Sequence, residues 1–278
     1  MNTKKKKVHK MYIYIALTLL TLIVAFPLYY AIITSTLSMQ ETYMYPPKFL
    51  PSTHFIGNIV AAWKSVNMSR MMFNSVFIST VVALAKVFIS LFAAFALTYF
   101  GKFKGKALLF GVILSVQMLP LPVRIVPTFA LMKDFGWVNT YFAITIPFFA
   151  TTTGILLYRQ FFLQVPNSIS DAARIDGATS WRFFWSILFP MTKNVTAALF
   201  IIEFIFIWGQ YLWPLIVTNS SDMRVVQIGV KMMLASEAQA AQWNVIMAGS
   251  LLVILPPLAV FLVFHRSILK GFGLKEEK

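Results

Sequence analysis

Long apolar runs alternate with short polar segments over the whole chain. A helix that crosses a bilayer needs ~20 consecutive, mostly apolar residues, and six runs reach this length. They lie at about 11–34, 72–98, 107–127, 141–162, 194–217 and 244–264. The pattern predicts an all-α fold, namely a polytopic membrane protein with six transmembrane helices, in which residues 1–278 form a single transmembrane domain.

The composition excludes a soluble protein with a large core. Apolar residues make up 59% and charged residues 12% of the chain, against about 45–50% and about 25% in soluble domains. The absence of cysteine excludes disulfides, thiolate metal sites and thiol catalysis, and the three scattered histidines indicate no metal site. The net charge of +15 is explained by lysines in cytoplasmic loops, so membrane lipid rather than nucleic acid is the expected partner.

The distribution of lysine and arginine predicts which side of the membrane each terminus occupies. An even number of spans puts both termini on one side. If that side is the cytosol, the inside segments are 1–10, 101–106, about 163–193 and 265–278, and they carry most of the positive residues. Since positive residues favour the cytoplasmic side, we expect a multi-pass membrane protein with both termini in the cytosol. The first run is too long for the apolar core of a signal peptide and is predicted to be an uncleaved span.

The polar segment at about 163–193 begins with the signals of a short helix. Ser168 followed by Asp171 fits a capping box that starts the helix, and Gly177 fits the left-handed residue that ends it. A narrow apolar stripe runs along this helix, formed by Ile169, Ala172 and Ala173. Small side chains in the stripe allow another surface to approach closely.

A second short helix is predicted to follow in the same segment. Thr179 or Ser180 begins it, and Pro190 is expected to stop it before the next span. The two helices either are held by a cytosolic partner or lie on lipid as an amphipathic surface helix. Lipid contact would place Asp171 and Asp176 against an anionic leaflet, which favours the partner.

This segment resembles the cytoplasmic loop of ABC importer permeases. The family pattern is Glu-Ala-Ala, three residues, Gly, nine residues, then Ile-x-Leu-Pro, and the spacing from Asp171 to Pro190 is intact. Asp171 replaces the usual Glu, and Phe189 replaces the usual Leu. The resemblance implies a cytoplasmic coupling-helix loop that docks into a cleft on a cytosolic ATPase and passes its closure to the spans. The residues that would carry this coupling are Asp171, Ala172, Ala173, Asp176, Gly177, Ile187 and Pro190.

Other motifs are similar to the carbohydrate-uptake branch of these permeases. They are Met118–Thr128, Tyr158–Phe162, Ala172–Ala178, Trp208–Leu215 and Ile254–Pro257, and they look most like the second permease subunit of sn-glycerol 3-phosphate importers. The resemblance implies one permease domain in a bacterial cytoplasmic (inner) membrane. It would work with a sister permease, a dimer of ATP-binding subunits and an extracytoplasmic substrate-binding protein. ATP and Mg would be bound by the partner ATPase, with no cofactor and no catalysis in this chain. Gly209 stands where the family usually has Asn, and another sugar, polyol or glycerophosphodiester stays open as the substrate.

Ionisable residues within the predicted spans are candidates for a substrate path. A lysine at the centre of a span costs ~2.5–3.5 kcal/mol, so Lys86 either pairs with Glu203, the acid of the fifth span, or helps an anion to cross. Arg124 suits a phosphate because a guanidinium matches its geometry, or it is an arginine of the outer interface. The proline-rich run 118–127 indicates a broken helix near the translocation path, and ordinary packing kinks are the alternative.

Aromatic and amide groups near the end of the fifth span could bind a polyol or form an aromatic belt. These are Trp208, Gln210, Tyr211 and Trp213. A membrane enzyme that acts on lipid would want clustered His, Asp or Glu, which this chain lacks. An autonomous channel or ATP-independent carrier would not need the coupling loop. The chain also has no G-x-x-x-x-G-K-[ST] motif for nucleotide binding.

Overall fold

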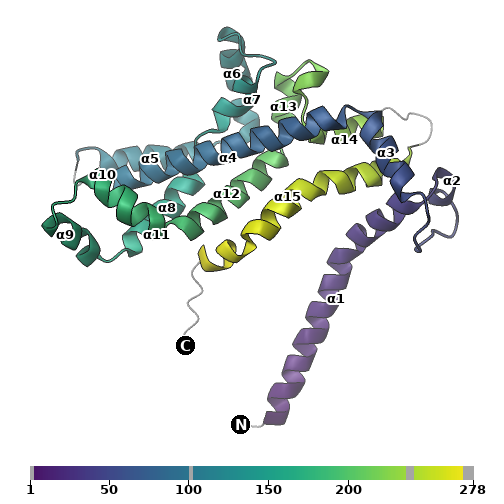
Figure 1. Ribbon diagram of the computed structural model, residues 1–278, viewed down its shortest axis with the longest axis horizontal. Helices are drawn as coiled ribbons and strands as arrows, with labels where there is room; N and C mark the ends of the chain where they lie inside the picture. The colour runs from purple at the N-terminus through teal and green to yellow at the C-terminus, as the bar shows by residue number, and fades with distance from the viewer. Residues whose placement is uncertain (1–2, 100–102, 236–240, 272–278) are drawn as a thin grey trace. The chain divides into compact units, whose positions relative to one another are not determined.

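The computed structural model describes residues 3–99, 103–235 and 241–271, and every regular element within these ranges is a helix (Figure 1). The chain divides into two compact units. The first unit comprises Met1–Ser69 and Gly229–Leu255, and the second comprises Arg70–Ile228 and Pro256–Lys278. The expectation that residues 1–278 form one domain stays a prediction.

The first unit is built around the end of the N-terminal helix. Its elements are α1 (Thr3–Thr36), α2 (Met39–Thr42), α3 (Phe55–Ser65) and the adjoining parts of α14 (Val226–Ala235) and α15 (Trp243–Gly271). The last carbonyls of a helix have no partner within it. Here the buried Asn58 Nδ2 donates to the carbonyl oxygens of Ser35 and Leu37, both at 2.8 Å. Asn58 Oδ1 accepts from Asn244 Nδ2 at 2.8 Å, so one amide links α1, α3 and α15.

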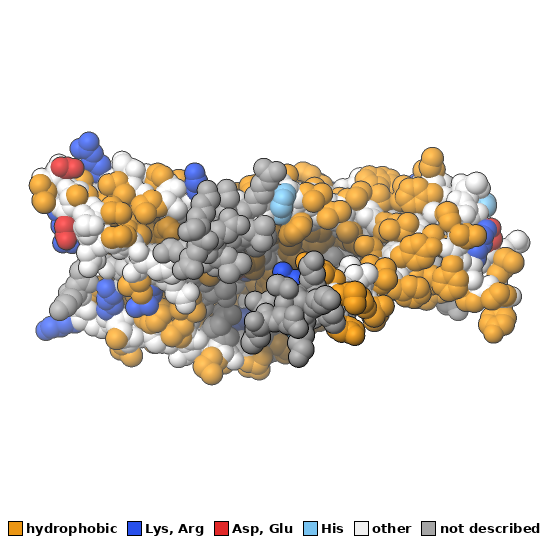
Figure 2. All heavy atoms as spheres, turned by 90° about the horizontal axis from the view of Figure 1, so that it is seen from below, with side chains coloured by type: hydrophobic (Ala, Val, Ile, Leu, Met, Phe, Trp, Pro, Cys, Tyr) orange, Lys and Arg blue, Asp and Glu red, His pale blue; other side chains and the backbone are white. Residues whose placement is uncertain are grey.

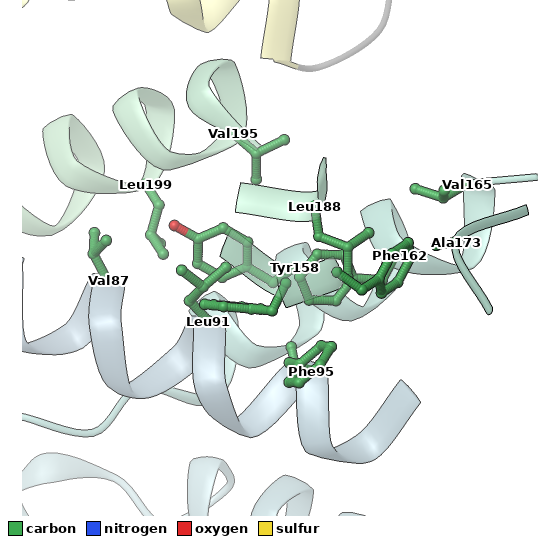
Figure 3. Packing of buried hydrophobic residues seen from close by; sticks show 13 residues of the cluster. Val87, Leu91, Phe95, Tyr158, Phe162, Val165, Ala173, Leu188, Val195 and Leu199 are labelled. Atoms are coloured by element: carbon green, nitrogen blue, oxygen red, sulfur yellow. The ribbon is translucent and has the colours of Figure 1, made fainter. Parts of the chain in front are cut away.

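The second unit contains the larger apolar core. Its elements are α4 (Met68–Tyr99), α5 (Lys106–Gln117), α6 (Leu121–Asp134), α7 (Tyr141–Thr145), η1 (Ile146–Phe148), α8 (Thr152–Gln164), α9 (Asn167–Ile175), α10 (Ser180–Phe183), η2 (Phe184–Leu188), α11 (Phe189–Met191), α12 (Lys193–Trp208), α13 (Leu212–Val217) and η3 (Ser221–Met223). Fully buried Tyr158 of α8 lies among Leu91 of α4, Leu188 of η2 and Leu199 of α12 (Figure 3). Its hydroxyl is satisfied by Thr196 Oγ1 at 2.8 Å, so the core buries this phenol without stranding its polar atom.

Among the described residues, three helices are long and apolar enough to cross a membrane. They are His9–Thr36, Met68–Tyr99 and Trp243–His265, and they confirm the first, second and sixth predicted spans. Tyr141–Phe148 with Thr152–Gln164, bent by 40°, and Ser180–Met191 with Lys193–Trp208, bent by 70°, raise the number to five if each bent pair is one span. The structure therefore supports a multi-pass helical membrane protein. By length and apolar composition, the described helices account for three to five spans and not for the predicted six.

The third predicted span, 107–127, is divided between two helices. Helix α5 ends at Gln117, Pro120 is extended, and α6 begins at Leu121. The reason is proline chemistry: the residue before Pro120 is disfavoured in the helical region, and Pro120 cannot donate a backbone hydrogen bond. Pro122 lies in the first turn of α6, where a missing N–H donor is tolerated. The predicted break in the 118–127 run is confirmed.

The fifth predicted span, 194–217, is also divided. Helix α12 ends at Trp208, and α13 begins at Leu212. Pro214 cannot donate to the carbonyl of Gln210 four residues earlier, which prevents one helix from running through the junction.

Apolar side chains cover much of the surface of the described residues. On the face shown in Figure 2, hydrophobic side chains are widespread and charged ones are few. Helix α1 is exposed along almost all of its apolar length. Such a surface fits contact with lipid or with other membrane subunits.

Candidate functional site

The helix α9 begins two residues earlier than predicted, because its N-cap is Pro166 and not Ser168. It starts at Asn167 directly after Pro166 and has no side-chain cap, so the predicted capping box of Ser168 and Asp171 is wrong. Pro166 fixes the extended backbone that precedes the helix, which leaves Ser168 inside the first turn.

The end of α9 is the predicted left-handed glycine cap. Gly177 has φ of 69°, its N–H donates to the carbonyl of Arg174 at 3.0 Å, and Ala178 N–H donates to the carbonyl of Ala173 at 2.9 Å. This pair of bonds is a Schellman motif. Because a Cβ on Gly177 would meet no atom within 4 Å, the requirement for glycine is conformational rather than steric.

The second short helix starts as predicted and ends later. Thr179 Oγ1 accepts the N–H of Arg182 at 3.3 Å and caps α10. The helix does not stop at Pro190, because a π-helical turn at Phe184–Leu188 precedes α11 and the helix continues to Met191. Proline has no backbone N–H to donate, and the wider π-helical turn before it accommodates the missing hydrogen bond. The chain then bends by 70° between Met191 and Lys193.

The predicted coupling residues divide into an inner and an outer set. Ala173 is buried at the edge of the core cluster (Figure 3) and Ile187 packs against it. The outer set is exposed and comprises Asp171, Ala172, Asp176, Gly177 and Pro190. Sequence reasoning missed Ile175, whose side chain is 86% exposed beside these polar residues. Ile175 therefore extends the exposed set along α9.

A second candidate site is a cavity of about 220 Å³ inside the second unit. Lys86 of α4, Arg124 of α6 and Glu203 of α12 all line it. Lys86 Nζ lies 2.6 Å from Glu203 Oε2, and the two side chains are 5% and 6% exposed. The predicted pairing of Lys86 with Glu203 is therefore confirmed.

Two further groups hold this ion pair in place. Thr151 Oγ1 donates to Glu203 Oε1 at 2.9 Å, and the Lys86 ammonium lies 5.0 Å from the centre of the Phe206 ring. Burying two charges is costly unless such partners satisfy them. Sequence reasoning missed Thr151, although the Thr151–Thr153 run inside a predicted span was a visible polar signal.

The other predicted path residues are packed into the protein. Trp213 is buried, and its Nε1 donates to the carbonyl of Ala143 at 3.0 Å. Trp208 is buried beside Phe204, and Tyr211 is half-buried. Trp208, Gln210 and Trp213 line a void of about 10 Å³, which is about the room needed for one water molecule. Their part in a substrate path stays a prediction.

Among the residues that the structure describes, no three His, Cys, Asp or Glu side chains gather closely enough to hold a metal ion.

A helical, multi-pass fold with an exposed helix–glycine–helix segment and a cavity that contains a buried ion pair is typical of a membrane transport subunit. A sequence profile described as "Binding-protein-dependent transport system inner membrane component" matches residues 86–272. The chain therefore belongs to this family of ABC importer permeases, which are transport subunits and not enzymes.

Curated relatives cover nearly the whole chain. It is 38% identical over 255 residues to the sn-glycerol-3-phosphate transport system permease protein UgpE of Escherichia coli O1:K1, covering 90% of each chain. The protein of the same name from Agrobacterium fabrum is 38% identical over 265 residues, covering 93% of this chain and 94% of the relative. The one from Yersinia enterocolitica is 36% identical over 256 residues, covering 90% and 91%.

Solved structures show the same fold. A crystal structure of a bacterial ABC transporter that imports the acidic polysaccharide alginate matches with a TM-score of 0.83 at 18% identity, covering 96% of this chain and 98% of the other. A second structure, of a bacterial alginate ABC transporter in complex with its alginate-bound periplasmic protein, matches with a TM-score of 0.64 at 14% identity, covering 94% and 95%.

Proposed function

We propose that the chain is the permease subunit that carries sn-glycerol 3-phosphate across the membrane by alternating access. The observation that carries this proposal is the 38% identity to permeases of that transport system over 90% of both chains. The cavity that contains Lys86 and Arg124 supports it, because cationic side chains form strong hydrogen bonds with a phosphate. Another sugar, polyol or glycerophosphodiester imported by the same machinery is the alternative.

Uptake by the assembled transporter in vesicles tests the substrate. Radiolabelled sn-glycerol 3-phosphate should enter only with ATP and the binding protein present, and unlabelled substrate should compete. Competition by a neutral sugar alone would favour the alternative. Uptake by this chain without ATP would instead make it an autonomous carrier.

The proposed assembly contains a sister permease, a dimer of ATP-binding subunits and an extracytoplasmic binding protein, all in contact with membrane lipid. ATP and Mg are bound by the ATP-binding subunits. The exposed face of α9 docks into one of these subunits, and closure of their dimer moves the segment that surrounds Gly177. Exposure of Asp171, Ala172 and Ile175 supports this contact.

Single cysteines test the docking, since the chain has no cysteine of its own. Ala172→Cys and Ile175→Cys should form crosslinks to the ATP-binding subunit. Ala173→Cys is the matched control, because its side chain is buried and it should react poorly. Crosslinks from the first two variants to lipid alone would contradict the docking.

We also propose six crossings with both termini in the cytosol, with broken helices serving as the third, fourth and fifth spans. The excess of lysine and arginine in the inside segments supports this orientation. His9→Cys should be protected from an impermeant thiol reagent in intact cells, whereas Thr53→Cys, in the loop between α2 and α3, should be labelled. The opposite result would reverse the orientation.

A further inference from the structure

The cavity of Lys86 and Arg124 has unused capacity to bind an anion. An ammonium has three N–H donors and a guanidinium has five. Within the part of the chain that the structure describes, Lys86 has one hydrogen-bond acceptor, Glu203. Arg124 is exposed on the cavity wall and has no hydrogen bond or ion pair there. Most of the donors of these two side chains are therefore unused.

The charges that line the cavity do not cancel. Lys86 and Arg124 contribute two positive charges and Glu203 one negative charge, so the formal sum is +1. The cavity of about 220 Å³ is smaller than the sites of about 300–1,000 Å³ that hold drug-sized ligands. Its size and charge both fit a small anion.

Glu203 is held as a fixed competitor for the lysine. Thr151, the residue that precedes α8, makes no capping bond with its side chain. It donates to Glu203 Oε1 instead, at 2.9 Å, although a threonine in this position ordinarily accepts from the first turn of its helix. The carboxylate therefore stays anchored on one oxygen when its other oxygen loses the ammonium.

We propose that Glu203 is the built-in counter-ion of an anion site in this cavity. The phosphate group of a small soluble ligand binds to Arg124 and competes with Glu203 for the ammonium of Lys86. Glu203 keeps Lys86 charged and in place in the empty site, and it limits how tightly the anion is held, which favours release. Glu203 thus sets the affinity without being a ligand itself. This inference rests on the proposed transport function and adds a specificity-determining residue to it.

The experiment uses a single cysteine at Thr153, which is exposed on the cavity wall, in the fully assembled transporter in phosphatidylcholine vesicles. The rate of modification by an anionic and by a cationic methanethiosulfonate reagent reports the local potential. Inorganic phosphate and sn-glycerol 3-phosphate are the protecting probes, and glycerol is the neutral control. A cysteine at Thr53, which does not line the cavity, should show no protection.

Phosphate should protect Thr153→Cys, and glycerol should not. Glu203→Gln should lower the half-protecting phosphate concentration by about tenfold and raise the anionic-to-cationic rate ratio, because one negative charge is removed from beside the ligand. Arg124→Gln should raise the half-protecting concentration by about tenfold, for the opposite reason. Absence of protection, or a half-protecting concentration that Glu203→Gln leaves unchanged or raises, would overturn the proposal.

A second variant covers the case in which Glu203→Gln fails to fold. Lys86→Met combined with Glu203→Gln removes both charges and leaves no unpaired ion. It should raise the half-protecting phosphate concentration, whereas a purely structural ion pair predicts no change. Vesicles with added phosphatidylglycerol test the other source of phosphate: protection by the lipid with no soluble phosphate would overturn the soluble-ligand proposal.

The same data separate this inference from the transport proposal. Phosphate protection in the expected order, without uptake of sn-glycerol 3-phosphate, keeps the anion site and rejects the substrate. Uptake of sn-glycerol 3-phosphate without any protection rejects the anion site and keeps the substrate.

Discussion

Two lysine–glutamate pairs in this protein have the same length and different surroundings. Lys86 and Glu203 in the second unit, and Lys48 and Glu41 in the first, each have an Nζ–O distance of 2.6 Å. The side chains of Lys86 and Glu203 are 5% and 6% exposed, whereas those of Lys48 and Glu41 are 35% and 22% exposed. A third pair, Arg174 and Asp171 on α9, is longer at 3.7 Å and is 75% and 60% exposed.

Geometry alone does not give the energy of an ion pair. Water weakens the attraction between exposed charges and removes the penalty for separating them. A buried charge that loses its partner keeps its desolvation cost. The three pairs therefore form a series in which the effect of removing one partner should fall as exposure rises.

Lys86→Met should have the largest effect. It leaves the carboxylate of Glu203 buried with Thr151 as its one donor among the residues that the structure describes. Breaking a buried pair in this way costs about 3–5 kcal/mol. The expected result is a strongly lowered unfolding midpoint of the detergent-purified protein, measured by a thermal fluorescence assay. The double variant Lys86→Met/Glu203→Gln is the control and should recover most of the loss. If Lys86→Met were as stable as the unsubstituted protein, burial would not explain the energy of this ion pair.

Acid should release the Glu41 pair. The side chain of Lys48, then the backbone N–H of Ser38, lower the pKa of Glu41 to about 2 from its ordinary 4.5. A carboxyl whose pKa is lower in the folded state stabilises that state above its ordinary pKa, and this contribution is lost as the pH falls toward about 2. Hydrogen exchange of the amides at 38–52, corrected for the intrinsic rate, should show protection falling between these values. In the variant Glu41→Gln, amide protection at 38–52 should not fall over this pH range. If the variant and the unsubstituted protein had the same pH profile, Glu41 would be excluded as the cause.

Salt should separate the exposed pair from the buried one. Lys48→Met is expected to lower amide protection in the 38–52 loop by no more than about fivefold, since partly exposed pairs contribute little. In the unsubstituted protein, high salt should reproduce part of this loss, because screening acts on exposed charges. The midpoint difference between the unsubstituted protein and Lys86→Met should hardly change with salt. Equal salt sensitivity of both effects would contradict the assigned difference in burial.

Local signals in the sequence were sufficient for some of these features. Long apolar runs predicted α1, α4 and α15, and a glycine after a short helix predicted the cap at Gly177. Prolines predicted the break after α5. Each of these depends on neighbouring residues alone, which is why one sequence reveals them.

Features that depend on residues far apart along the chain were not predictable in the same way. The pairing of Lys86 with Glu203 joins positions 117 residues apart, and the sequence left it open against a role in anion transfer. The contribution of Thr151 needed the position of α8 beside α12. The burial of Ala173 was hidden because its neighbour Ala172 has the same chemistry, and only packing against the core distinguishes the two.

Arg174→Gln should have the smallest effect on stability. Both side chains of its pair are well exposed and 3.7 Å apart, so the unfolding free energy should change by no more than about 0.5 kcal/mol. Asp171→Ala should be equally neutral in the same thermal assay. If α9 is the docking surface, however, Asp171→Ala should lower the amount of substrate imported per ATP hydrolysed by the assembled transporter. In that case the exposed charges of Asp171 and Arg174 would serve the contact with a partner subunit and not the stability of the fold. If either variant lost as much stability as Lys86→Met, the effect of removing a partner would not depend on the exposure of the pair.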